Sequence, residues 1–190
     1  MKLSKGLIGI IAAVVIIGGW AASAYNGMVG VQEEATTALA NVQSAYQRRA
    51  DLIPNLVETV KGYAAHEKET LEGVVNARSK ATSINLDAEN IEEFQKAQGE
   101  LSSALGRLIA VSEAYPDLKA NENFRDLQVQ LEGTENRINE ARNQFNKTVQ
   151  NYNVQIRRFP KNLLAGIFGF DTMSKFEAEA GAEKAPQVKF

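Results

Sequence analysis

Cysteine is absent from the 190 residues of this chain, and histidine occurs only once. Without a thiol, the protein has no disulfide, no cysteine-ligated metal and no thiol catalysis. A basic surplus is also missing, because 21 Lys and Arg residues face 23 Asp and Glu residues. That balance predicts no surface basic enough to bind nucleic acid through counterion release. Proline is scarce, with four residues, and frequent Ala, Glu, Gln, Lys and Leu favour helices over sheets.

The single histidine also argues against the familiar catalytic motifs. His66-Glu67 matches the start of the zinc-protease motif, but the second histidine position is occupied by Thr70. A di-iron bundle needs a glutamate three residues before the histidine, where this chain has Tyr63. A nucleophile elbow and a glycine-rich phosphate loop are both absent from the sequence. The sequence therefore predicts a protein that is not an enzyme, with no catalytic residue, cofactor or metal ligand.

One long apolar run lies near the N-terminus. Residues 6–32 carry no charge, and Leu7–Ala24 is almost wholly apolar. A helix of about 20 apolar residues crosses the roughly 30 Å hydrocarbon core of a bilayer. Residues 6–25 are therefore predicted to be a single transmembrane anchor in contact with membrane lipid.

The charges around this anchor predict its orientation. Lys2 and Lys5 precede it and the first charges after it are acidic, so the positive-inside rule places residues 1–5 in the cytoplasm and the soluble part outside. A cleaved signal peptide is the alternative, since Ala22-Ser23-Ala24 fits a cleavage site, although signal cores are usually only roughly 7–15 residues long. Small residues four apart in the anchor would let two such helices approach closely, which permits a homo-oligomer.

After the anchor, apolar residues recur at steps of three and four, the period of a buried helix seam. The predicted helices cover Tyr25–Ala50, a stretch from Ile53 to about 84, a stretch from about 88 to Tyr115, and Phe124–Tyr152. No proline occurs in the first of these helices, so it is predicted to run straight out of the membrane span. Breaks fall at Asn85-Leu86-Asp87, at Tyr115-Pro116-Asp117 and at Phe159-Pro160, and the polar Gln98 and Ser112 occupy seam positions of the third helix. The fold class is therefore predicted as all-α: a single N-terminal transmembrane helix followed by an elongated up-and-down antiparallel bundle of three to four long helices.

Pro54 lies between the first two of these predicted helices. Proline cannot donate to a helix interior and moves the residue before it, Ile53, away from helical geometry. Asp51 could cap a new helix that holds Pro54 in its first turn. We therefore predict either a sharp kink or a reversal of the chain near Pro54.

Charged residues interrupt the seam at Glu67 and Arg78. One interpretation is a polar layer inside the bundle, in which these two pair with Arg48, Arg49, Glu113 or Arg142 on other helices and fix how the helices align. The other is a seam that drifts off register and leaves both residues partly solvated. Arg48 and Arg49 could instead form an exposed docking patch for another protein.

The C-terminal part divides into an apolar segment, residues 160–176, and a small, acidic and Ala-rich stretch, residues 177–190. The apolar run 163–170 is too short to cross a bilayer, so it is expected to dock on the bundle or to lie at a membrane or partner surface. Residues 177–190 are predicted to be a flexible tail. Val188 and Phe190 at its end could be a peptide ligand for strand addition of the kind that PDZ domains bind. The alternative is a disordered end that no partner binds.

Blocks of residues spread over the chain recur together in one known family. They are Arg48-Arg49, Asp51-Leu52-Ile53-Pro54-Asn55-Leu56-Val57, Lys61-Gly62-Tyr63, His66-Glu67, Ala77-Arg78, Glu113-Ala114-Tyr115-Pro116-Asp117-Leu118-Lys119-Ala120-Asn121, Asn123-Phe124, Leu127-Gln128, Glu135, Ala141-Arg142, Phe145-Asn146, Tyr152-Asn153, Phe159-Pro160 and Gly169-Phe170. On these residues the chain resembles the LemA family along nearly its whole length after the anchor. Phe145 is a mild departure, because the family often has tyrosine there.

The resemblance implies a single-pass bacterial inner (cytoplasmic) membrane protein whose residues 26–159 form a LemA-like helical bundle. The resemblance implies no established enzymatic chemistry. It does imply an association with membrane quality-control proteins such as HtpX-type metalloproteases and TPM-domain proteins. We therefore expect a membrane-anchored scaffold or adaptor that binds protein partners, among them membrane proteases. The alternative is a self-assembling structural or membrane-organising envelope protein without a dedicated client.

Overall fold

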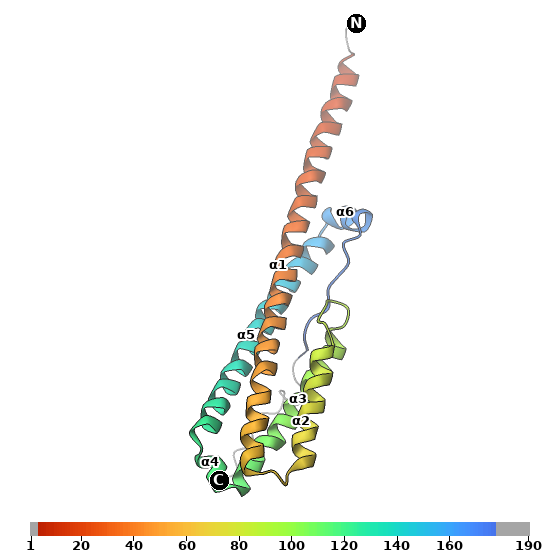
Figure 1. The fold of residues 1–190 in the computed structure, drawn as a ribbon. Helices are drawn as coiled ribbons and strands as arrows, with labels where there is room; N and C mark the ends of the chain where they lie inside the picture. Colours follow the sequence, from red (N-terminus) through yellow and green to blue (C-terminus); the bar gives the residue numbers. More distant parts are fainter. Residues whose placement is uncertain (1–3, 178–190) are drawn as a thin grey trace, which may run out of the picture.

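The computed structural model describes residues 4–177. Every regular element in that range is a helix: α1 (Lys5–Tyr63), α2 (Lys68–Ser83), α3 (Ile91–Val111), the 3-10 turn η1 (Ser112–Ala114), α4 (Pro116–Ala120), α5 (Glu122–Arg157) and α6 (Lys161–Phe168). Figure 1 shows an elongated molecule in which the N-terminal part of α1 extends far beyond the other helices. The predicted all-α fold, an apolar N-terminal helix followed by further helices, is confirmed.

Helix α1 is the long axis of the molecule. Its 59 residues correspond to about 88 Å of helix. Ser4 caps its start, since the Ser4 hydroxyl oxygen accepts a hydrogen bond from the Leu7 N–H at 3.3 Å. An 18-residue window of α1 has a mean hydropathy of 2.3 and is only 6% buried, which makes α1 the one helix among residues 4–177 that is long and apolar enough to span a membrane. From Ala24 onward, one face of the same helix becomes buried by its neighbours.

Pro54 does not end α1, and the predicted reversal at that position is wrong. The helix continues to Tyr63, and the chain turns back only at residues 64–67. Proline has no N–H, so the Ala50 carbonyl lacks its usual donor four residues later. The Arg78 Nε of α2 donates to that carbonyl at 2.8 Å and replaces the missing bond. Asp51 caps nothing and instead accepts a hydrogen bond from the Gln47 amide at 2.7 Å.

Three hydrophobic clusters follow one another along α1. The cluster farthest from the exposed end joins α1 to α2, α3 and the start of α5, where Phe124 is fully buried. The middle cluster joins α1, α3 and α5 around Phe145. The third joins α1 to the end of α5 and to α6, where Met28 and Tyr152 are fully buried. This order shows that α5 runs antiparallel to α1 over most of its length, as Figure 1 also shows.

The loop between α2 and α3 shortens the third predicted helix. Asp87 does not cap it, because its carboxylate accepts from the nearby Glu89 N–H at 2.7 Å and holds a turn. Asn90 closes the same loop by accepting from the Asp87 N–H at 2.9 Å and donating to the Asn85 carbonyl at 2.6 Å. Helix α3 therefore begins at Ile91.

After α6 the chain runs back along the bundle without regular structure to Glu177. Side-chain amides hold this segment in place. Asn153 accepts from the Met173 N–H at 3.0 Å and donates to the Met173 carbonyl at 2.9 Å, and Asn146 makes the same pair of bonds with Phe176, both at 2.9 Å. Gln95 on α3 does likewise with Glu177, at 3.0 and 3.3 Å. We call residues 171–177 the strapped segment.

Candidate functional site

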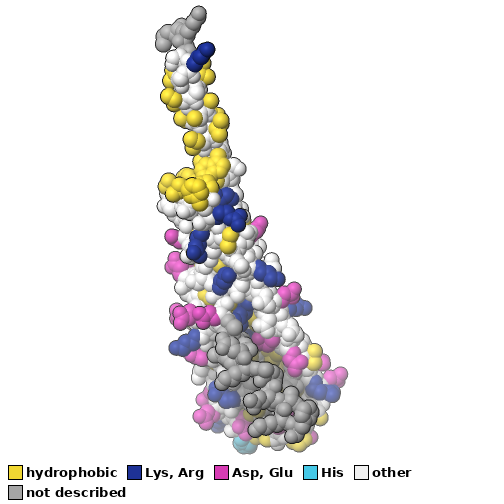
Figure 2. All heavy atoms as spheres, turned by 180° about the vertical axis from the view of Figure 1, so that it is seen from behind, with side chains coloured by type: hydrophobic (Ala, Val, Ile, Leu, Met, Phe, Trp, Pro, Cys, Tyr) yellow, Lys and Arg dark blue, Asp and Glu magenta, His cyan; other side chains and the backbone are white. Residues whose placement is uncertain are grey.

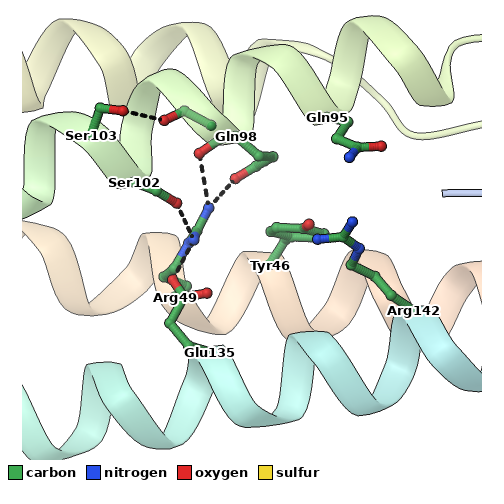
Figure 3. Close-up of a pocket in the computed structure, with 9 residues that line it drawn as sticks. Tyr46, Arg49, Gln95, Gln98, Ser102, Ser103, Glu135 and Arg142 are labelled. Carbon is green, nitrogen blue, oxygen red and sulfur yellow. Dashed lines mark hydrogen bonds and ion pairs between the residues drawn. The ribbon is translucent and has the colours of Figure 1, made fainter. Parts of the chain in front are cut away.

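Arg49 of α1 is the most completely enclosed charged residue in the described part of the chain, at 1% exposure. Its guanidinium points between α3 and α5 (Figure 3). Nη1 donates to the Ser102 hydroxyl at 2.9 Å and to the Glu135 carboxylate, while Nη2 donates to the Gln98 side-chain oxygen at 2.7 Å and to the Gln98 carbonyl at 3.4 Å. The Nε has no hydrogen-bond partner among the described residues.

Gln98 extends this cluster to a fourth helix. Its side-chain amide donates to the Ala81 carbonyl of α2 at 3.4 Å, while its oxygen accepts from Arg49. Arg49, Gln98, Ser102 and Glu135 therefore form a polar layer that ties together α1, α2, α3 and α5, and we call this set the Arg49 layer. Burying an unpaired charge is strongly unfavourable, so such a layer selects the one helix alignment in which every partner is in reach.

A pocket of about 390 Å³ opens beside the Arg49 layer. Tyr46 forms part of its wall, with its ring edge-on to Phe94 at 5.0 Å and the Arg49 guanidinium 5.2 Å from its centre. Arg142 lies next to Tyr46 in Figure 3. The remaining lining residues are Gln95, Gly99 and Ser103 of α3 together with the members of the Arg49 layer.

Arg142 connects this pocket to the strapped segment. Its Nη2 donates to the Glu177 carbonyl at 2.6 Å, and its guanidinium stacks 5.4 Å from the centre of the Phe176 ring. Phe176 in turn packs edge-on against Phe145 at 5.5 Å. The strapped segment thus ends at the pocket, held by a buried arginine and a buried aromatic ring.

The structure does not gather the five predicted site residues into one layer. Arg49 and Arg142 border the same pocket, whereas Arg48 is exposed and lines a separate groove of about 390 Å³ between α1 and α5. The other residues of that groove are Leu52, Val129, Gln130, Gly133, Thr134 and Arg137.

The partners predicted for the two seam charges are wrong. Glu67 accepts a hydrogen bond from the Tyr115 hydroxyl at 3.0 Å, near the end of the bundle farthest from the exposed part of α1. Arg78 bonds the Ala50 carbonyl rather than a carboxylate, and Glu113 pairs with Lys119 at 2.6 Å. Val188 and Phe190 lie outside the described residues.

Several members of these sites were missed from the sequence. Gln98 stood out as a polar residue on an apolar seam, which was a usable signal. Glu135 and the amides Asn146 and Asn153 belong to the blocks that carry the family resemblance, but that resemblance gave them no role. Ser102 carried no signal, because it sits next to the seam, where polar residues are ordinary.

Two tyrosines have shifted pKa values. The hydrogen bond to the Glu67 carboxylate raises the pKa of Tyr115 above its ordinary 10.0. Burial, together with the nearby Asp171 carboxylate, raises the pKa of Tyr152, whose hydroxyl donates to the Asp171 carbonyl at 2.8 Å. On the surface, the hydrogen bond from Lys80 at 2.6 Å lowers the pKa of Glu100. Among residues 4–177 there is no group of three or more His, Cys, Asp or Glu side chains placed to hold a metal ion.

Comparison with known proteins finds one family and several relatives. A model of the LemA family matches residues 38–190. The chain is 29% identical to the magnetosome protein MamQ of Magnetospirillum gryphiswaldense over 189 residues, which cover 86% of this chain and 70% of that protein. It is 26% identical to magnetosome protein MamQ 2 of Paramagnetospirillum magneticum, with 84% of this chain and 66% of that protein covered. Protein LemA of Metamycoplasma hominis is also 26% identical, over 80% of this chain and 68% of its own length.

Proposed function

Because this chain belongs to the LemA family, we propose that it is a membrane-anchored helical-bundle scaffold or adaptor that binds other proteins in the bacterial cell envelope. One observation carries the proposal: the apolar spanning helix and the central helix of the bundle are the same continuous helix, α1. A surface built on α1 is held at a fixed height relative to the membrane. That is what a scaffold needs when its partners are themselves membrane proteins.

The groove beside Arg48 is the binding surface that we assign to this function. Arg48 of α1 and Arg137 of α5 lie with the exposed Val129 along one groove, so an acidic segment with an apolar residue fits its charge and its character. Arg49, Glu135 and Arg142 are engaged in holding helices and the strapped segment together. We accordingly propose a binding protein without catalytic activity.

Crosslinking in intact membranes tests the adaptor role. A photo-crosslinking residue at Val129, in the groove, should yield reproducible adducts with other membrane or envelope proteins, identified by mass spectrometry. The matched control is Val75 of α2, which is also exposed but lies away from the groove. Adducts that are the same at both positions, or that are absent at Val129, would contradict a specific partner at this groove.

Self-assembly is the second candidate function. The spanning part of α1 is almost wholly exposed in a single chain, so its faces are open to a second copy. In the same experiment, adducts made only between copies of this chain would favour a structural, membrane-organising protein, as its likeness to magnetosome proteins also allows.

We place the protein in the inner membrane with one pass and with the bundle outside the cytoplasm. Lys5 before the span and Glu33 and Glu34 after it support this orientation. Since the chain has no cysteine, a single Val129→Cys substitution gives an unambiguous site for a membrane-impermeant maleimide. Labelling of residue 129 in intact spheroplasts is expected. Labelling only after lysis would show that the bundle lies in the cytoplasm instead.

The C-terminal residues are the part of this proposal that concerns membrane proteases. Val188 and Phe190 have the alternate spacing of side chains that strand-adding domains bind. Deleting residues 186–190 is expected to abolish co-purification with such a protease while the groove adducts at Val129 persist. Undiminished recovery of the protease would show that these C-terminal residues do not bind it.

A further inference from the structure

Helix α6 exposes an apolar face that the bundle does not cover. Ala165 is buried against the rest of the molecule, but Phe159 is 76% exposed and Ile167 75%. Leu163, one turn before Ile167, and Phe168 are also exposed. Large apolar side chains gathered in this way mark a surface that meets another apolar phase.

The position of α6 along α1 says which phase that is. The Tyr25 ring of α1 packs edge-on against Phe168 at 4.9 Å and against Phe170 at 5.6 Å. At the other end of α6, the Lys161 Nζ lies beside Gly27, 3.8 Å from where a Cβ would be. The apolar run of α1 ends at Ala24, after about 27 Å of helix, close to the thickness of a hydrocarbon core. Helix α6 therefore sits at the level where α1 leaves the hydrocarbon.

The orientation and the flanking charges fit the same place. Figure 1 shows α6 lying across the long axis of the molecule, which is parallel to the membrane plane when α1 crosses it. Figure 2 shows the hydrophobic patch at the foot of the exposed part of α1, with Lys and Arg side chains directly beside it. Arg157, Arg158 and Lys161 are the basic residues at this end of α5 and α6, and the acidic ones nearby are Asp171 and, farther along α1, Glu33 and Glu34.

We propose that α6, with Phe159, is a second membrane contact that lies in the interface of the bilayer that α1 spans. Its exposed aromatic and aliphatic side chains enter the boundary between headgroups and acyl chains, and Arg157 and Arg158 face lipid phosphates. A helix in a bilayer can rotate and tilt, and interfacial anchors limit both. Two contacts fix the rotation of α1, and hence the direction in which the groove beside Arg48 faces.

The absence of cysteine gives a direct test. The full chain with Ile167→Cys carries a nitroxide label and is reconstituted into phosphatidylcholine–phosphatidylglycerol vesicles. Collision of the label with oxygen, which concentrates in lipid, is compared with collision with a water-soluble nickel chelate. Val129→Cys, 66% exposed on α5, is the control for water, and Val15→Cys, 67% exposed on α1, is the control for hydrocarbon.

The label at 167 is expected to be several-fold less accessible to the chelate than the label at 129. Its depth in the bilayer is expected to be smaller than that of the label at 15. Equal chelate accessibility at 167 and 129 overturns the proposal. So does protection from both reagents with dipolar broadening between labels, which would show that a second copy covers α6. The proposal rests on insertion of α1, which the label at 15 reports separately: chelate access there would refute the anchoring itself.

The headgroup contact has its own readout. Adding phosphatidylglycerol to phosphatidylcholine vesicles should draw the label at 167 deeper, and Arg157→Gln/Arg158→Gln should abolish that dependence on anionic lipid. The matched pair Arg107→Gln/Arg125→Gln, both exposed and far from α6 on α3 and α5, should leave it intact. A lipid dependence that survives the first pair would overturn the assignment of these arginines.

Discussion

At the scale of single residues, Arg48 and Arg49 show what a sequence motif leaves open. Neighbours on a helix point about 100° apart, because 3.6 residues make a turn, so one can be solvated while the other is enclosed. Arg49 lies at 1% exposure with partners on two other helices, whereas Arg48 lines an open groove. The motif was visible, but which arginine enters the bundle depended on residues 49 to 86 positions away in sequence.

Removing the Glu135 carboxylate should destabilise the fold, because it leaves the buried Arg49 guanidinium without a counter-charge. Glu135→Ala takes away the only carboxylate among residues 4–177 that pairs with the Arg49 guanidinium, which stays buried. Because the Glu135 side chain is itself 43% exposed, we expect a loss of about 2 kcal/mol rather than the full cost of a buried pair. That corresponds to a melting temperature about 4–8 °C lower for the full chain in detergent, followed by circular dichroism. The exposed Glu132→Ala, one turn earlier, should change it by no more than about 1 °C.

Tyr115 makes stability depend on pH in a known direction. The Glu67 carboxylate raises the pKa of Tyr115 in the folded state, so the folded protein holds this proton more tightly than the unfolded chain. Its contribution is complete below the unfolded pKa of about 10 and is lost as the pH rises through the higher folded-state pKa. Tyr115→Phe should therefore melt lower than the parent chain at pH 8, and the gap should narrow above pH 10. A gap that stays constant to pH 11 would contradict the hydrogen bond as its cause.

At the scale of helices, periodicity predicted the elements well and their ends less well. The three-and-four spacing of apolar residues is imposed by burial of one face, and α3 and α5 follow it. Pro54 was a strong local signal for a break, yet α1 passes through it because Arg78 arrives from another helix to bond Ala50. Local sequence could not predict this, since the compensating donor comes from 28 residues away.

A double-mutant cycle tests this compensation. Arg78→Met leaves the Ala50 carbonyl without a donor, at a cost of about 1–3 kcal/mol. In a Pro54→Ala chain the backbone N–H of residue 54 is restored, so the same Arg78→Met change should cost less by about 1 kcal/mol or more. Urea or thermal unfolding of the four chains measures the coupling, and a coupling near zero would show that the Arg78 bond does not substitute for the missing one.

The strapped segment gives a prediction for another element. Asn146→Asp keeps the acceptor for the Phe176 N–H but removes the donor to the Phe176 carbonyl and adds a charge beside it. We expect hydrogen exchange at residues 173–177 to speed up at least several-fold while α1 and α5 keep their protection. Asn151→Asp, on the exposed face of α5, is the matched control. Faster exchange throughout α5 in Asn146→Asp would mean that the helix, not the strap, had been weakened.

At the scale of the whole molecule, α1 has two parts of different character. Its N-terminal part is apolar, exposed and long enough to span a membrane, and the rest is one wall of an ordinary water-soluble core. The sequence predicted both halves. A run without charges indicates a helix surrounded by hydrocarbon, and an apolar seam indicates a helix with one buried face and one face in water. The absence of proline directly after the span also predicted a helix that runs straight on from it, and α1 is that continuous helix through Ala24. How far it continues, through Pro54 to Tyr63, could not be predicted from this part of the chain.

The division of α1 into these two parts predicts that the bundle survives without its anchor. Of the residues of α1 that are buried, only Ala24 precedes Met28, and all three hydrophobic clusters draw on residues from 28 onward. A fragment of residues 26–190 should therefore fold in water, with the same helical content per residue and cooperative melting within a few degrees of the full chain in detergent. Because this fragment keeps α6 but lacks the span, it should bind phosphatidylglycerol vesicles weakly and lose that binding with Ile167→Ser and Phe159→Ser. An unfolded fragment would show that the span stabilises the bundle through more than its point of attachment.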